Sequence, residues 1–501
     1  MQPAGGAGLG HQAGFAEGRG LIFEKEKMII YSGIYGENGS FFDTTGSSIT
    51  ETVHSYSRGK NVTDEVIPDS VIAIGKCTFY GQTELTSITF PETVNTIGRD
   101  AFRGCTGLTE LRLPSSLVSL GSGAFADCTG LVRVELNGGQ IAGGAFTGCV
   151  NLQTFQIAPD CSLWAEGAAL LDTSRDMPTL LCAPTATGEY LVPEGVGKLA
   201  ARAFEGCKGL KRVVLPDSVT AIGENAFAEC FDLEEVVLPA GLKSIAKETF
   251  DSCHKLRQVN LPESVKKIGD RAFAGCESLE VLALPPKLGE IGENAFDGCC
   301  RMTLASSIQG SLKKLGTRAF AGCESLTVLV IGAKKTVELG SGVFARCKKL
   351  QEVRVLSQEA KIHAKSCEDW EGALVMPYIA IGELPAACKE HAVLGFVRLD
   401  LEMRSAKPQA AKKSKKPETS ETLREDYCKY IKAQKKKLYP AAVEHEELLQ
   451  LMFTEKMIPQ KDIDLLLEEC EKQKNTTAKV VVLEYAHQNF KPANTDKNYK
   501  L

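Results

Sequence analysis

Residues 207–227 read CKGLKRVVLPDSVTAIGENAF, and residues 253–273 read CHKLRQVNLPESVKKIGDRAF. Both stretches end in an Ala-Phe pair that recurs along most of the chain. From Phe79 to Phe344 the repeated phenylalanines are 21 to 24 residues apart, except for one interval of 58 residues between Phe146 and Phe204. Self-similarity at a fixed period in the twenties indicates a solenoid whose coils stack on one another.

One coil shows what each position does. In residues 233–256, Val236 and Leu238 share one side of a short strand and Glu235 lies on the other, before Pro239 ends the strand. A coil of this size cannot bury its apolar side alone, so a core forms only between neighbouring coils. We therefore expect the repeated phenylalanines to form a buried ladder: Phe102, Phe125, Phe204, Phe227, Phe250, Phe273, Phe296 and Phe320.

The repeat C-x-x-L-x-x-I-x-L-P-x-S-V-x-x-I-G-x-x-A-F resembles the BspA-type (treponemal) class of leucine-rich repeat, over roughly residues 66–356. The resemblance implies an α/β repeat solenoid with a parallel sheet on its concave face. It also implies contacts with proteins or glycans rather than catalysis, and a bacterial or protozoan source.

Composition divides the chain into segments. We expect residues 1–60 to hold a disordered N-terminus and a cap, residues 61–357 the solenoid, and residues 358–406 a C-terminal cap. Residues 407–417, KPQAAKKSKKP, are a Lys/Pro linker by composition. Residues 418–490 form a small all-α module, followed by a tail at residues 491–501.

The long interval between Phe146 and Phe204 predicts an insertion at about residues 158–198. It is expected to contain two strands joined by a turn at residues 173–176, and the family resemblance implies a hairpin that projects from the solenoid. Trp164 has two interpretations: it fills core space left by a missing phenylalanine, or it is a binding residue on a protruding loop.

In the C-terminal module, apolar residues at helical spacing predict four amphipathic helices. Ser420 is the expected N-cap of the first helix, and Pro440 and Pro459 are expected to start the second and third.

Ten of the eighteen cysteines occupy the same position of the repeat: Cys105, Cys128, Cys149, Cys207, Cys230, Cys253, Cys276, Cys299, Cys323 and Cys347. A column of identical cysteines indicates small buried side chains with weak S–H donors rather than a metal site.

Free thiols favour a reducing compartment. The chain start shows neither a positively charged segment nor an apolar run of the kind a secretory signal needs. We therefore expect a cytoplasmic location, with the cell surface as the alternative.

The sequence contains no complete catalytic or cofactor-binding motif. His445 and Glu446 begin an H-E-x-x-H pattern, but Leu449 replaces the second histidine. We expect no enzyme, no cofactor and no metal. The net charge of −5 gives no general attraction to nucleic acid, and no apolar run is long enough for membrane insertion.

The outward positions of the predicted concave strands are the candidate partner-binding residues. They are polar in the first half, with Glu110, Arg112, Arg212 and Glu235, and apolar in the second half, with Val281, Ala283, Val328 and Val330. An exposed apolar patch indicates a protein contact site; the alternative is that the C-terminal cap or the helical module folds back over it.

The function predicted is a non-enzymatic scaffold for protein partners, with a cell-surface adhesin as the alternative. A carbohydrate-binding module would need exposed aromatic residues on these strands, and they carry none.

Overall fold

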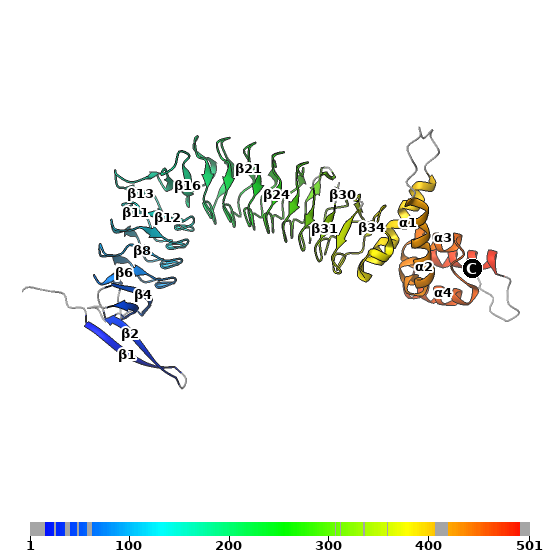
Figure 1. Ribbon diagram of the computed structural model, residues 1–501, viewed down its shortest axis with the longest axis horizontal. Coiled ribbons are helices and arrows are strands. Elements are labelled where there is room, and N and C mark those ends of the chain that lie inside the picture. The colour runs from blue at the N-terminus through cyan, green and yellow to red at the C-terminus, as the bar shows by residue number, and fades with distance from the viewer. Residues whose placement is uncertain are drawn as a thin grey trace, which may run out of the picture. The chain divides into compact units, whose positions relative to one another are not determined.

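The computed structural model describes residues 16–24, 27–35, 41–47, 50–57, 63–305, 307–310, 312–333, 336–357, 359–405 and 419–490. The chain forms two compact units, Met1–Pro262 and Glu263–Leu501. The linker at residues 407–417 and the tail at residues 491–501 lie outside the described residues. Strands of successive coils follow one another along each unit in Figure 1. The predicted parallel-strand solenoid with a helical C-terminal region is confirmed.

Each regular coil contributes two short strands and a tight turn. In the coil of residues 233–256, the first strand is β21 (Glu235–Val237), and β22 (Ser244–Ile245) follows after Pro239. The Thr-Phe pair and Cys253 then form the turn that closes the coil. Corresponding strands of neighbouring coils pair in parallel, so each coil extends two separate ladders.

The first unit begins with an antiparallel meander of β1 (Ala16–Glu24), β2 (Lys27–Tyr35), β3 (Phe41–Ser47) and β4 (Thr50–Ser57). β1 differs from the expectation of a disordered start. β4 pairs in parallel with β6 (Val71–Ile74), and the ladder of second strands continues through β8 (Thr96–Ile97), β10 (Ser119–Leu120) and β12 (Gln140–Ile141). The first strands are β5 (Asp64–Val66), β7 (Ser87–Thr89), β9 (Glu110–Arg112), β11 (Arg133–Leu136) and β13 (Thr154–Ile157).

The insertion interrupts both ladders. β14 (Leu163–Glu166), β15 (Ala169–Asp172) and β16 (Thr179–Cys182) form an antiparallel meander, and β16 then pairs in parallel with β18 (Lys198–Leu199). The turn expected at residues 173–176 does lie between two antiparallel strands, but buried Leu170 and Leu180 tie these strands to the core. Trp164 is 46% exposed, so the interpretation of Trp164 as a core filler is wrong. Regular coils resume with β17 (Gly188–Leu191), β19 (Leu210–Val214), β20 (Ala221–Ile222), β21, β22 and β23 (Gln258–Val259).

The second unit also contains two ladders of parallel strands. Its second strands are β24 (Lys267–Ile268), β26 (Glu290–Ile291), β29 (Lys314–Leu315), β31 (Val337–Leu339) and β33 (Ala360–Ile362). Its first strands form two sheets: β25 (Val281–Leu282) with β27 (Thr303–Leu304), and β28 (Ile308–Gly310), β30 (Val328–Ala333), β32 (Glu352–Val355) and β34 (Ala373–Val375). β33 and β34 make one further coil beyond residue 357, where the repeat pattern is no longer visible in the sequence.

Short helices η1 (Ile381–Glu383) and η2 (Ala386–Cys388) lead into α1 (Lys389–Ser405), which packs against β34. The C-terminal module contains α2 (Thr419–Glu444), α3 (Glu446–Thr454), η3 (Gln460–Asp462), α4 (Ile463–Lys472) and α5 (Thr476–Asn489). The prediction that Pro440 starts a helix is wrong: Pro440 lies inside α2, and the chain breaks instead at His445. Likewise α2 already includes Ser420, so Ser420 is not its N-cap.

Aromatic stacks join the helices to one another. The Tyr427 ring of α2 is buried and stacks on Phe396 of α1 with ring centroids 4.6 Å apart, and Phe453 of α3 stacks on Tyr485 of α5 at 3.9 Å. Arg424 of α2 adds an ion pair to Asp400 of α1 at 3.0 Å. Because α1 packs on β34 and on α2, the last coil and the helical module share one continuous packed region.

The predicted phenylalanine ladder is the centre of the solenoid core. Phe227 stacks between Phe204 and Phe250, with ring centroids 5.0 and 5.4 Å away and the rings within 9° of parallel. The whole predicted set is fully buried: Phe102, Phe125, Phe204, Phe227, Phe250, Phe273, Phe296 and Phe320. A third ladder of backbone hydrogen bonds runs beside the rings, because ladder phenylalanines donate their N–H groups to the next coil, as Phe102 does to the Ala124 carbonyl at 2.7 Å.

The turn geometry explains the residues around each Ala-Phe pair. The residue before the alanine has a left-handed backbone, as at Asp100 (φ 52°), Asn225 (φ 58°) and Asn294 (φ 52°). Asn, Asp and Gly tolerate this region best. The glycine of the Ile-Gly pair has a different role: a Cβ on Gly316 would lie 2.5 Å from the backbone nitrogen of Glu293 in the preceding coil.

Truncation of a central ladder ring tests the core. We expect Phe227→Ala to lower the free energy of unfolding by about 3–5 kcal/mol, because the cavity lies between two stacked rings and cannot collapse. Phe231→Ala is the matched control, since Phe231 is 47% exposed, and should cost less than about 1 kcal/mol. Equal losses for the two variants in denaturant titrations followed by circular dichroism would contradict the ladder.

The glycine column makes a separate prediction. Gly316→Ala should destabilise the second unit by roughly 1–3 kcal/mol, because the new methyl group meets backbone that cannot move without breaking the coil stack. Gly382→Ala is the control, because a Cβ there has no neighbour within 4 Å. The thermal unfolding midpoints of the two variants provide the measurement, and an unchanged midpoint for Gly316→Ala would exclude the close approach.

Candidate functional site

The outward side chains of the first strands form one surface on each unit, which we call the first-strand face. On the first unit this surface is mostly polar, with half-buried Val214 and Val237 among its residues, and its charges are paired across neighbouring strands. Arg133 lies 3.4 Å from Glu110, and Arg112 lies 3.5 Å from Glu135, because the parallel register places each pair side by side. Exposed pairs of this kind contribute about 0–1 kcal/mol each, so they make the surface neutral rather than strongly charged.

Arg212 repeats this arrangement farther along the first unit. It lies between Glu189 and Glu235, hydrogen-bonded to both, with its Nε 3.1 Å from the Glu235 carboxylate. Of the predicted binding residues, Glu110, Arg112, Arg212 and Glu235 are therefore all engaged with neighbours on the same face.

The first-strand face of the second unit carries the predicted apolar residues. Val281 is 61% exposed and Val328 is 49% exposed, Ala283 is exposed, and Val330 is half-buried. Thr303 continues the row, because it pairs in register with Val281. We call Val281, Ala283, Thr303, Val328 and Val330 the valine patch. In the described part of the unit no helix covers Val281 or Val328, so the alternative of a cap folded over them is not observed.

The C-terminal cap covers only the last coils. Arg354 on β32 is hydrogen-bonded to Glu402 of α1 and to Glu352, while Arg398 of α1 lies 3.7 Å from Glu352. Glu352 is 8% exposed as a result. Strand alternation alone would leave Glu352 and Arg354 on the open face; their cover by Glu402 depends on how α1 packs.

The family model of the BspA type leucine rich repeat region matches residues 50–168, 188–303 and 243–370, in six copies. These matches cover more than half of the chain. The chain belongs to the BspA-type leucine-rich repeat family.

Several solved structures are similar to this leucine-rich repeat protein. A leucine rich cell surface protein from Faecalibacterium prausnitzii is 22% identical, with 57% of this chain and 95% of that chain covered and a TM-score of 0.38. A leucine rich repeat protein of T. pallidum is 33% identical over 36% of this chain and 86% of its own, with a TM-score of 0.34. A leucine-rich repeat protein from Eubacterium ventriosum is 18% identical over 55% of this chain and 88% of its own, with a TM-score of 0.41. No curated protein is significantly similar in sequence.

The repeated cysteines have a structural role in these leucine-rich repeats. All ten are buried and free. The Cys230 thiol donates to the Phe204 carbonyl at 3.0 Å, and Cys253 does the same to Phe227 at 3.1 Å. Burial raises the pKa of Cys105 and of Cys149 to about 12, so these thiols stay protonated and unreactive. No group of residues suited to a metal ion occurs in the described parts of the chain.

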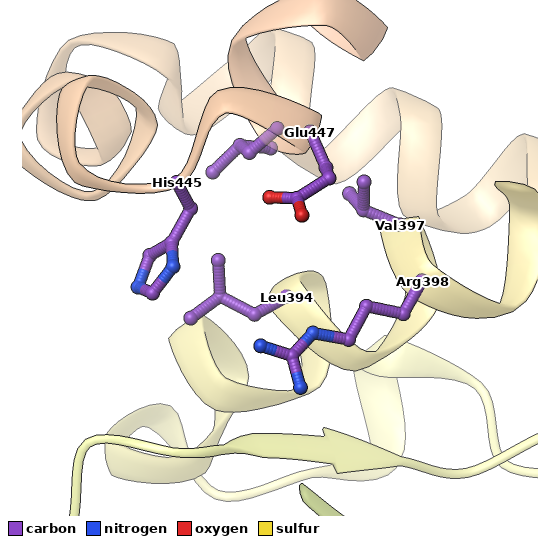
Figure 2. A pocket seen from close by; sticks show the side chains of 6 residues that line it. Leu394, Val397, Arg398, His445 and Glu447 are labelled. Carbon is purple, nitrogen blue, oxygen red and sulfur yellow. The ribbon is translucent and has the colours of Figure 1, made fainter. Parts of the chain in front are cut away.

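The failed zinc-protease motif lies at the helical end of the leucine-rich repeat protein. Figure 2 shows His445 and Glu447 at the start of α3, facing Leu394 and Arg398 of α1. The cavity between them is about 10 Å³, which is room for about one water molecule. Arg398 also donates to the Gln351 carbonyl at 3.0 Å, so this cluster joins α1 to the solenoid end and leaves no space for a substrate. Among the helices described, none is long and apolar enough to cross a bilayer.

Thiol modification tests the cysteine column. With iodoacetamide near neutral pH we expect exposed Cys77 to react at least about tenfold faster than Cys105 or Cys149, because burial and a raised pKa both suppress the thiolate. Peptide mass spectrometry gives the rates, and unfolding in guanidinium is the control in which every cysteine should react. Equal rates in the native protein would show that the column is not closed to solvent.

Proposed function

We propose that this protein is a non-enzymatic protein-binding scaffold, and that the valine patch is the centre of its contact surface. The observation that carries the proposal is the exposure of Val281 on β25 and of Val328 on β30, two first strands of a packed solenoid that are separated by the coil of β27 and β28. Other outward residues of the first-strand face are mostly polar, and the exposed apolar ones, Val66 on β5 and Leu191 on β17, lie singly. A desolvated apolar centre with a polar rim is the usual arrangement of a protein interface.

Charged pairs next to the patch supply such a rim. Arg301 lies 3.1 Å from Glu280, one residue before Val281, and the cluster of Arg354, Glu352 and Glu402 closes the other side. A partner that covers the valines would therefore meet balanced charges around an apolar centre. This pattern favours a protein over nucleic acid, which requires a positively charged surface.

The helical module supports a scaffold with two contact regions. It packs on the end of the solenoid through α1, and its α4 and α5 expose Leu465 (41%) and Val480 (42%). A second partner on this module would be held at a fixed distance from the valine patch, since both belong to one unit.

Compartment distinguishes the scaffold from the adhesin. All eighteen cysteines are free, including exposed Cys77, and free thiols in this number favour a reducing compartment. The alternative is a surface adhesin, and one similar structure is named a cell surface protein.

Substitution of the patch tests the binding role. We expect Val281→Arg and Val328→Arg each to weaken capture of a partner roughly tenfold or more, because a buried cation would replace an apolar contact. Val118→Arg is the matched control, since Val118 is equally exposed at 61% but precedes a second strand. The measurement is quantitative mass spectrometry of proteins retained by the full chain. Partners retained equally by all variants would refute the valine patch as the docking centre.

The compartment of the protein is tested on intact source cells. Protease treatment of intact cells should leave the protein undigested and recoverable in the soluble fraction. Digestion on intact cells would instead establish the adhesin alternative, and partner screens would then use extracellular proteins.

A further inference from the structure

One coil of the first unit lacks the ring that the ladder requires. Ala183 stands in the phenylalanine position: its N–H donates to the Ala203 carbonyl at 2.8 Å, as the N–H of Phe204 donates to Ala226. The Ala183 carbonyl accepts the Cys207 thiol at 3.2 Å, as the Phe204 carbonyl accepts Cys230. A methyl group therefore occupies the place of a benzyl group, inside residues 169–187 that the family model does not match.

Ala183, which is 2% exposed, lies in the wall of a cavity of about 340 Å³ that opens beside Leu191, itself 65% exposed. We call it the Ala183 pocket. Its walls include the methyl groups of Ala169, Ala183 and Ala186, with Tyr190 on one side and Glu166 from the insertion. First strands β13 and β17 do not pair with each other, so the pocket lies where the ladder of first strands is interrupted.

Two side chains of the pocket have no partner in the described structure. Tyr190 is held by an edge contact to the Phe204 ring, with centroids 5.2 Å apart, and its register matches buried Val213. Burial, followed by the nearby charge of Glu166, raises the pKa of Tyr190 to about 12, so the phenol stays neutral. Among the described residues, no hydrogen bond is made to the Tyr190 hydroxyl and no cation pairs with Glu166.

The charge of the pocket selects its occupant. Glu166 is the only charged side chain among the described lining residues, and no lysine, arginine or histidine lies in the walls. An apolar occupant would leave this carboxylate beside the interface without a counterion. A cation on a long alkyl chain satisfies both the alanine walls and the carboxylate.

We propose that the Ala183 pocket binds the side chain of an arginine or lysine of a partner polypeptide. The alkyl stem lies against Ala183, Ala186 and Leu191, and the cation lies near the Glu166 carboxylate and the Tyr190 ring. This inference rests on the proposed protein-binding role, and adds to the first-strand face a second, polar contact point that does not involve the valine patch.

A displayed library of random heptapeptides, selected on the full-length protein, identifies the occupant. We expect selected peptides to share an arginine or lysine, and synthetic copies to be measured by fluorescence polarisation. Glu166→Gln should weaken their binding tenfold or more, while Glu234→Gln, an exposed glutamate outside the pocket, should leave it unchanged.

Ala183→Phe is the decisive variant, because it places a ring at the ladder position and in the wall of the pocket. It should abolish peptide binding and raise the thermal midpoint, which also shows that the variant folds. Peptides without a basic residue that bind equally well to Glu166→Gln would overturn the cationic occupant. Unchanged binding to folded Ala183→Phe, or no enrichment of basic residues, would overturn the pocket itself.

The two proposals can fail separately. Val281→Arg and Val328→Arg should leave the selected peptides bound with wild-type affinity, whereas Ala183→Phe should leave capture through the valine patch intact if a partner uses only that patch. Loss of peptide binding in the valine variants would also overturn the Ala183 pocket as an independent site.

Discussion

The structure depends on one constraint: no coil can bury its own apolar side. Each regular coil places a phenylalanine, a cysteine and the inward residues of two strands against the next coil, and backbone N–H groups of the turns donate across the same boundary. Stability is therefore a property of boundaries between coils rather than of coils. This stacking also explains the glycine of each Ile-Gly pair: the backbones of adjacent coils lie so close at this position that a side chain would not fit between them.

The same constraint explains why irregular coils are the informative ones. Where a coil keeps all its contacts, its interior is full and only its outward residues are free to vary. Where a contact is lost, as at Ala183, space opens inside the stack, and the inserted meander of β14, β15 and β16 covers only part of it. At the last coil, Trp370 has the opposite effect: it stacks against His391 of α1 and donates to the Leu350 carbonyl at 2.8 Å, so the end of the ladder is closed by a larger ring.

The first-strand face differs in chemistry between the two units: paired charges are prominent on the first unit, and exposed valines are prominent on the second. Parallel register brings Arg133 beside Glu110 and Arg212 beside Glu235, so these residues satisfy one another and retain a hydrated, neutral surface. Val281 lies beside Thr303 and Val328 beside Glu352, so neither valine is part of an ion pair, and both remain apolar and exposed. A packed β-solenoid holds such residues in place before a partner arrives, which lowers the entropic cost of association.

The sequence by itself determined the period, the parallel stacking, the ladder of phenylalanines and the buried cysteine column, because each follows from a residue type that recurs at one position. It also identified the outward residues of each strand, since side chains alternate along a strand. Only the tertiary structure decided which of these outward residues remain exposed and unpaired. Ion pairs between strands depend on register, and the cover of Glu352 by α1 depends on helix packing. The Ala183 pocket depends on a ring missing from a coil too degenerate to align, and the interior of α2 accepts Pro440 although local rules predict a boundary there. These features arise from contacts between residues far apart in the chain, which no local pattern records.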